Sequence, residues 1–339
     1  MPELCKVSDV VLALDRITGG RVVTETADLF SGTNRFVVTK SSGIPGKAVT
    51  ETPGLVFGDP AQAVRRLAVS MTLTESQLEL AGATGIDAIV AHHPVADAAN
   101  SGGVPLKSYV SLYSIAILEL HEAFHGLHPG LPFIHGHRSF RVDVAYGGIP
   151  GNVMYVGTAL EGVSTAGDVL TRLESFGGFD VEHALLQQER ELRGNDNIQE
   201  TNAATGACIL NGSPASPVKT ILHIFPHTGF SVAHLEQALQ EHPEIDTVVA
   251  SISRVRPGHP LVEKANERGL TFVLGNTHAL EILENGMPLA VALEALLPGV
   301  EVLLLRERAT LVPLVAAGTP AIRTYARDIA ERFLIPDRS

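Results

Sequence analysis

Apolar runs alternate along the chain with stretches of helical periodicity. Residues 64–71 are mostly apolar, a helical stretch follows Thr74, and a second apolar run covers residues 86–91. Thr74 and Gln77 have the spacing of a capping box, which predicts where the helix begins. This order predicts a βαβ unit whose two strands are parallel and joined by a right-handed crossover.

The same order returns in the second half of the chain. Apolar runs at 218–225, 245–250 and 270–274 alternate with helical stretches at 231–241 and 261–268. The identity between the halves is low, so the repeat is a similarity of pattern only. The pattern predicts an α/β fold of two related lobes with mixed or parallel sheets.

Three segments follow from these patterns. Residues 1–155 are expected to form the first lobe, residues 156–215 a connecting segment, and residues 216–339 the second lobe with a C-terminal helix over about 319–334. Within the connecting segment, residues 188–207 are polar and rich in Gly and Asn. That composition predicts a loop or linker.

Composition narrows the class of protein. Of the 339 residues, 45% are hydrophobic, the formal net charge is −12, and Trp is absent. The negative charge disfavours a nucleic-acid partner, because phosphate backbones attract Lys and Arg. No run of about 18 apolar residues occurs, so no membrane span is expected. Cys5 and Cys208 form no paired motif, which favours a reducing cytoplasm.

Histidine is concentrated in one part of the chain. Seven of the 14 histidines fall between residues 92 and 137, where an even spread would place about two. His92 and His93 end the apolar run before Pro94, at the predicted carboxyl end of a strand. Because α/β sheets bind ligands at that edge, both imidazoles can face a crevice and suit two metal ions. A pair of loop histidines with hydrogen-bonding roles is the alternative.

Residues 108–127 have helical spacing and contain His121-Glu122-Ala123-Phe124-His125. On a helix, this motif places two histidines on one face as zinc ligands and a glutamate as base, as in zinc peptidases. The motif also arises by chance in a chain rich in His and Glu, and no third ligand follows at a recognised spacing. A set of helix-surface groups is therefore the competing interpretation. For the next pair, His135 and His137, loop hydrogen bonding is favoured over binding in the crevice.

The second lobe contributes a further candidate pair at a strand end. His278 and Glu281 are three residues apart at the start of a predicted helix, so their side chains share one face. Imidazole and carboxylate together suit divalent metals. Glu284 lies one turn further on, where a solvated helix face is the preferred interpretation. His227, in a turn of the same lobe, is positioned to act as an acid or base near neutral pH.

These features resemble the Nif-three-like dinuclear-metal proteins. The segments that carry the resemblance are residues 54–58, 64–71, 85–94 and 275–281. The similarity spans roughly residues 50–150 and 216–306, and the adjacent histidines at 92–93 are its most specific motif. The resemblance implies two α/β lobes, two divalent metal ions between them and a toroidal homohexamer. Members of the family are often labelled type 2 homologues of GTP cyclohydrolase I.

The resemblance also implies a ligand set. His92 and His93 would be ligands from the first lobe, and His278 with a following glutamate would be ligands from the second. The family carboxylate usually comes four residues after the histidine, but position 282 is Ile, so Glu281 is chosen and Glu284 is held in reserve. The family also has an aspartate in the first lobe. This chain has no clear equivalent, and we choose Glu122 as the third ligand.

The remaining candidates for that third position stay open. They are His121, His125, His137 and Asp143.

The expected function is a metal-dependent hydrolase in which two ions activate a bridging water. Zinc, iron, manganese or cobalt would suit the ligands, and the substrate would be a nucleotide or another small phosphorylated or cyclic-amide compound. One alternative is a mononuclear zinc peptidase that uses His121, Glu122 and His125. Another is a metal-binding regulatory assembly protein without turnover.

Overall fold

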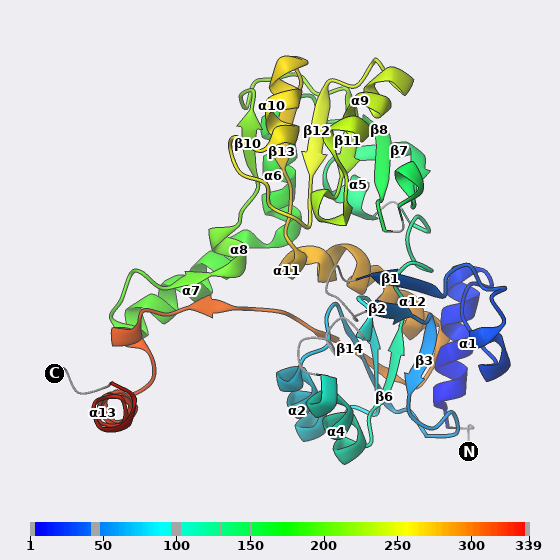
Figure 1. The fold of residues 1–339 in the computed structure, drawn as a ribbon, viewed down its shortest axis with the longest axis vertical. Helices are drawn as coiled ribbons and strands as arrows, with labels where there is room; N and C mark the ends of the chain where they lie inside the picture. Colours follow the sequence, from blue (N-terminus) through cyan, green and yellow to red (C-terminus); the bar gives the residue numbers. More distant parts are fainter. Residues whose placement is uncertain (1–3, 42–47, 96–102, 129, 150, 336–339) are drawn as a thin grey trace.

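Two α/β lobes lie one above the other in the computed structural model, with α11 (His278–Glu281) between them (Figure 1). An arm, formed by residues 179–204 and 310–335, projects to one side. The structure describes residues 4–41, 48–95, 103–128, 130–149 and 151–335. Its mixed and parallel sheets confirm the predicted fold class. Within these ranges, no helix combines the length and apolar character needed to cross a membrane.

The sheet of the first lobe has the strand order β14, β4, β5, β6, β3, in which only β3 runs antiparallel to its neighbour. The strands are β3 (Gly54–Phe57), β4 (Arg66–Ser70), β5 (Ala88–Ala91), β6 (Ala116–Glu119) and β14 (Glu301–Leu305). One face packs against α1 (Val7–Thr18) and α12 (Met287–Leu296), and the other against α2 (Glu75–Thr84) and α4 (Gly103–Tyr113). Because helices cover both faces, every residue of β5 and β6 is buried.

The βαβ unit predicted from residues 64–91 is confirmed. Thr74 Oγ1 accepts a hydrogen bond from the Gln77 N–H (3.3 Å), and Gln77 Oε1 accepts one from the Thr74 N–H (3.1 Å). This capping box begins α2, and β4 and β5 on either side of the helix are parallel. The unit therefore brings the end of β5, and His92 with it, to the carboxyl edge of the sheet.

The sheet of the second lobe has the order β10, β13, β12, β11, β8, β7. Its strands are β7 (His137–Asp143), β8 (Met154–Ala159), β10 (Cys208–Asn211), β11 (Thr220–Ile224), β12 (Thr247–Ala250) and β13 (Thr271–Leu274). β11, β12 and β13 are parallel, as their alternation with helices predicted. One face packs against α9 (Val232–Glu241) and α10 (Pro260–Glu267), and the other against α6 (Ala166–Gly177).

The two sheets take strands from both sides of the expected boundaries at residues 155/156 and 215/216. β7, β8 and β10 belong to the sheet of the second lobe, whereas β14 belongs to the sheet of the first. The division of the chain into three segments at these boundaries remains a prediction.

A continuous helical segment links the lobes after β13. α11 passes into a π-helical turn, η4 (Ile282–Gly286), and then into α12. Ile282 and Leu293 of this segment belong to the core of the first lobe. π-Helical turns are rare and often occur at functional sites. The segment places His278 and Glu281 between the two lobes.

The arm contradicts the loop predicted at residues 188–207. α7 (Phe179–Arg193) runs into that range, and α8 (Thr201–Ala204) lies within it. Gln, Glu and Arg are good helix formers, and the pairs Glu189–Arg193 (3.1 Å) and Gln187–Glu191 (2.9 Å) link successive turns. The polar composition therefore indicates an exposed helix there rather than a loop.

The rest of the arm comes from the C-terminal part of the chain. β15 (Thr310–Leu311) pairs with β9 (Gln199–Glu200), and α13 (Pro320–Ile329) lies at the far end (Figure 1). α13 confirms the predicted C-terminal helix. None of its residues is buried.

The helix predicted over residues 108–127 is wrong beyond Tyr113. α4 ends there, Ser114 adopts φ 53°, and the chain enters β6. β6 lies between β5 and β3, and burial in the sheet overrides the helical spacing of these residues. Two smaller elements complete the surroundings of the crevice, the helix α5 (Gly130–Ile134) and the hairpin of β1 (Val38–Ser41) and β2 (Ala48–Glu51).

Candidate metal centre

His92 lies at the end of β5 with its ring orientation set by two neighbours. Its Nδ1 is 2.8 Å from the Leu120 carbonyl oxygen, which can only accept, so Nδ1 carries the proton. Its Nε2 accepts from Asn285 Nδ2 at 3.4 Å. The bond from Nδ1 fixes the ring so that Nε2, the nitrogen that accepts from Asn285, faces the site, as hydrogen bonds behind metal-ligating histidines do.

The carboxylate of Glu281 is shared by three imidazoles. Its Oε2 lies 3.1 Å from His93 Nε2 and 3.2 Å from His278 Nδ1, and its Oε1 lies 3.5 Å from His92 Nε2. Asn285 Nδ2 also donates to Oε1, at 2.9 Å. The two carboxylate oxygens thus face different imidazoles, His92 on one side and the pair His93 and His278 on the other.

Electrostatics keep Glu281 ionised in a buried position. Burial alone would raise the pKa of its carboxyl. The nearby His93 imidazole and the hydrogen bonds from His278 and His93 outweigh that penalty, and they hold the pKa of Glu281 well below its usual range. The site therefore contains a carboxylate at neutral pH.

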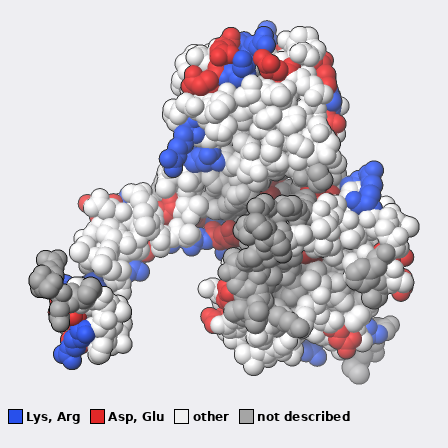
Figure 2. Space-filling view, in the orientation of Figure 1, with Lys and Arg blue, Asp and Glu red and all other residues white. Residues whose placement is uncertain are grey.

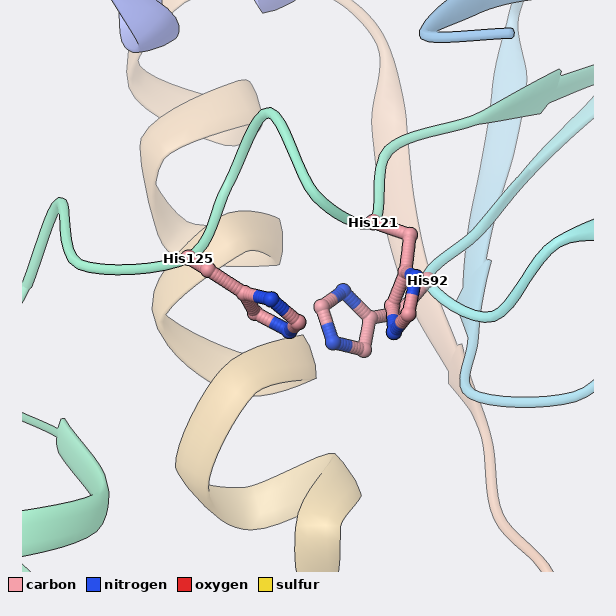
Figure 3. Close-up of side chains that lie close together, drawn as sticks. All are labelled: His92, His121 and His125. Atoms are coloured by element: carbon pink, nitrogen blue, oxygen red, sulfur yellow. The ribbon is translucent and has the colours of Figure 1, made fainter. Parts of the chain in front are cut away.

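A turn after β6 brings further donors to His92 (Figure 3). The rings of His92, His121 and His125 converge there, with the His121 and His125 centroids 4.6 Å apart. Glu122 Oε2 lies 3.3 Å from His125 Nδ1, and Glu51 Oε2 lies 3.0 Å from His121 Nδ1. Among the described residues, three overlapping groups could each hold an ion: His92, His121 and His125; His92, His93 and Glu281; and Glu51, His121 and Glu122.

The imidazoles of His92 and His121 are neutral at physiological pH. Burial lowers the pKa of His92, and burial together with the neighbouring His125 lowers that of His121 well below its usual value. Only neutral imidazole has a lone pair available for a metal ion. The buried cluster therefore presents nitrogen donors without a protonation barrier.

Two of the expected third ligands lie elsewhere. His137 is fully buried in the second lobe, with its Nε2 3.2 Å from His223 Nδ1. Asp143 pairs with Arg141 at 2.6 Å on the edge strand β7. Glu122, His121 and His125 remain as candidates beside His92.

The residues of the zinc-peptidase motif do not form a helix. Residues 121–126 form turns rather than the helix that the motif requires, and Glu122 contacts His125. The turn nevertheless brings the rings of His121 and His125 close together.

The other predicted histidines divide between the crevice and the interior. His227 lies beside His278, with ring centroids 5.1 Å apart, and lines the crevice. His135 is fully buried, 3.6 Å from Glu284 Oε1. The expectation of a solvated Glu284 is wrong, since its side chain is 1% exposed and burial raises its pKa well above the usual value.

Glu51 and Asn285 were not expected near the site. Glu51 precedes an apolar strand and has no motif around it, so no sequence signal marks it. Asn285 sits four residues after Glu281, and this helical spacing is the one signal that could have identified it.

Six of the donors, Glu51, His93, His121, His125, His278 and Glu281, line a crevice of about 730 Å³ between the lobes. Its polar side includes His93, His121, His278 and Glu281, and its other side belongs to the second lobe. Figure 2 shows Lys and Arg in small separate groups on the visible face rather than in one continuous patch.

The fold and the crevice together define a class, a two-lobed α/β protein with a histidine- and glutamate-rich site between its lobes. A family model described as Duf34/NIF3 (NGG1p interacting factor 3) matches residues 44–99, which contain His92 and His93. The match confirms the resemblance to the Nif-three-like family. A comparison with curated proteins found no match.

Solved structures share the fold over most of the chain. Reduced HcgD from Methanocaldococcus jannaschii aligns with a TM-score of 0.55 and 14% identity, covering 89% of this chain and 98% of that one. Protein SA1388 from Staphylococcus aureus gives 0.52 and 14%, with 89% and 96% covered. A Bacillus cereus protein related to NIF3 gives 0.52 and 11%, with 90% and 98% covered. At these identities the likeness shows the fold.

Proposed function

We propose that this protein binds two divalent metal ions in the crevice and uses them for hydrolysis. The proposed ligands are His92, His93, Glu122, His278 and Glu281. One observation carries the proposal: the two oxygens of Glu281 face different imidazoles, an arrangement suited to a carboxylate shared between two ions.

The donor set fits such ions. Buried neutral imidazoles and a buried ionised carboxylate are ligands that zinc, iron, manganese and cobalt accept. A buried carboxylate surrounded by imidazole nitrogens is also costly to leave without a cation. The ion identity stays open among these four metals.

For the third ligand from the first lobe, we retain Glu122. It belongs with Glu51 and His121 to one of the groups whose ligand atoms lie within 4.8 Å of one another. His121 and His125 compete for the role, since both group with His92.

The protein's own residues would orient the substrate and move protons. When bound, the metal ions would supply a water of lowered pKa. Burial lowers the pKa of His227 to about 4, so its imidazole is neutral at pH 7 and able to accept a proton from a reacting group in the crevice.

We further propose that copies of the chain associate through the arm. α13 exposes Ile322 (51%) and Tyr325 (60%), and a helix of this length is marginal alone in water. Paired with the same helix of a second copy, it would cover this stripe. Such pairing supports a homo-oligomer, with the hexamer as the expected state.

The remaining expectations are proposals of the same kind. They are a cytoplasmic location, a small-molecule substrate, no nucleic-acid partner, and an activity of the type implied by the label GTP cyclohydrolase type 2 homologue.

Metal analysis tests the function. Purified protein loaded with zinc or manganese is expected to hold two ions per chain by mass spectrometry, and His92→Ala to lose them. His183→Ala, on the exposed surface of α7, is the matched control and keeps both. One ion per chain, or an unchanged content in His92→Ala, would contradict the dinuclear site. A fully loaded protein that hydrolyses no nucleotide, phosphoester or cyclic amide would contradict the hydrolase.

A further inference from the structure

Opposite the proposed ligands, the crevice has an apolar wall built by the second lobe. It consists of five buried side chains that contact one another: Leu131, Val153, Tyr155, Phe225 and Ile252. All five line the crevice, and they form a cluster separate from the cores on the two faces of the second-lobe sheet. The cluster therefore shapes the crevice rather than holding helices onto the sheet.

Ile252 is held in this wall by an unfavourable backbone conformation. Its φ is 61°, in the left-handed region that a β-branched residue rarely adopts. Its N–H donates to the Asn276 carbonyl oxygen at 2.8 Å, and Ser251 N–H donates to the Ile224 carbonyl oxygen at 3.2 Å. Neighbouring strand ends thus fix the conformation. Strain that the surroundings maintain in this way is concentrated at ligand sites.

The two walls of the crevice differ in chemistry. Glu281, His93 and His278 form the polar side, whereas Ile252 and Phe225 belong to the apolar side. Among the side chains that the structure describes, neither Lys nor Arg lines the crevice. A ligand that matches both walls has a polar head at one end and an uncharged apolar body at the other.

We infer that the substrate has an apolar or aromatic body that lies against Ile252 and Phe225, with its hydrolysable group facing His93 and Glu281. Hydrolysis would break the bond between the attacked atom and its leaving group, adding the water hydroxyl to the attacked atom and a proton to the leaving atom. The chemical step rests on the proposed function, whereas the apolar subsite does not.

Ile252 is the residue that selects the apolar body. Ile252→Gly removes the side chain, and Gly adopts a positive φ without strain, so the backbone tolerates the change. Ser114 is the other non-glycine residue with positive φ among the described residues, at 53°, and it is exposed outside the crevice. Ser114→Gly is therefore a matched control.

Two hydroxamates of different size test the wall in zinc-loaded protein. Calorimetry is expected to show benzohydroxamate binding about tenfold more tightly than acetohydroxamate, because only the former has a ring to bury. The advantage disappears in Ile252→Gly and persists in Ser114→Gly. Equal affinities of the two hydroxamates in the wild type would overturn the inference.

Metal-free protein separates this inference from the proposed function. Benzohydroxamate is expected to shift the methyl NMR signals of Leu131, Val153 and Ile252 even without an ion, while acetohydroxamate does not. If the protein takes up no metal and these shifts remain, the hydrolase proposal fails and the apolar subsite stands. If metal binds and the shifts are missing, the metal centre stands and the subsite is refuted.

Discussion

His93 Nε2 lies 3.1 Å from Glu281 Oε2, although 188 positions separate the two residues. His93 follows β5 of the first-lobe sheet, and Glu281 lies on the helix that enters from β13 of the second. The contact joins the end of one sheet to the segment that leaves the other. A metal ion bound there should therefore raise the free energy of unfolding of both lobes.

Metal loading is accordingly expected to stabilise the wild type. With free zinc at 100 times its dissociation constant, each site would add about 2.7 kcal/mol to the free energy of unfolding. Glu281→Gln should lose most of this gain, because the amide carries no charge. Denaturant unfolding with and without zinc measures it. Glu294→Gln, exposed on α12, should keep the full gain; an equal gain in Glu281→Gln would contradict the shared carboxylate.

Acid should destabilise the metal-free protein through the buried histidines of the second lobe. Burial lowers the pKa of His135 to about 4 and that of His137 to about 3, against about 6.5 when unfolded. Between these values the unfolded chain binds protons that the folded chain does not. Stability is therefore full above pH 6.5 and declines as the pH falls, by about 2 kcal/mol for each imidazole at pH 5.

Urea unfolding between pH 7.5 and 5 checks this decline. The slope of the free energy of unfolding against pH reports how many more protons the unfolded chain binds. His137→Leu should lower that number by about one, since leucine does not titrate. His183→Leu, on the surface, should leave the slope as in the wild type. A flat profile in the wild type would show that these histidines are not buried as the structure has them.

His227→Ala is expected to separate catalysis from metal binding. Its imidazole lies beside the proposed ligand His278 but is not itself assigned to an ion. The variant should retain two ions per chain and lose about 100-fold in turnover of a hydrolysed substrate, the usual contribution of a general base. Parallel metal analysis and rate measurements decide it, with loss of metal or an unchanged rate as the contradicting results.

The capping box of α2 should contribute measurably to stability. Thr74→Ala removes the acceptor for the Gln77 N–H and should lower the free energy of unfolding by about 1 kcal/mol. Ser76→Ala, exposed in the same first turn, is the control and should change it little. Equal effects in a urea titration would argue against the cap.

Removing α13 should reduce the oligomeric state. Truncation after Gly318 deletes the exposed stripe of Ile322 and Tyr325, and mass photometry is expected to show a smaller species than the full chain. Metal content should stay the same, because α13 lies far from α11, which carries His278 and Glu281 (Figure 1). An unchanged assembly would place the contact between copies elsewhere.

Local patterns were sufficient for the regular elements. The capping residues and apolar runs around Thr74 predicted β4, α2 and β5, because caps and strand burial depend on neighbours in sequence. The same reasoning failed at residues 108–127. Part of that segment has helical spacing but forms β6, because it is buried between β5 and β3. It failed again at residues 188–193, which were predicted to form a loop because they are polar but form the end of the exposed helix α7.

The sequence by itself determined the α/β class, the strand end that carries His92 and His93, and the position of His278 at a second strand end. Only the tertiary structure decided which side chains meet. Glu51 and Asn285 reach the site and Asp143 does not, because convergence depends on how two sheets and one helix pack across the chain. The wall around Ile252 arises in the same way, from strand ends that have no common pattern in sequence.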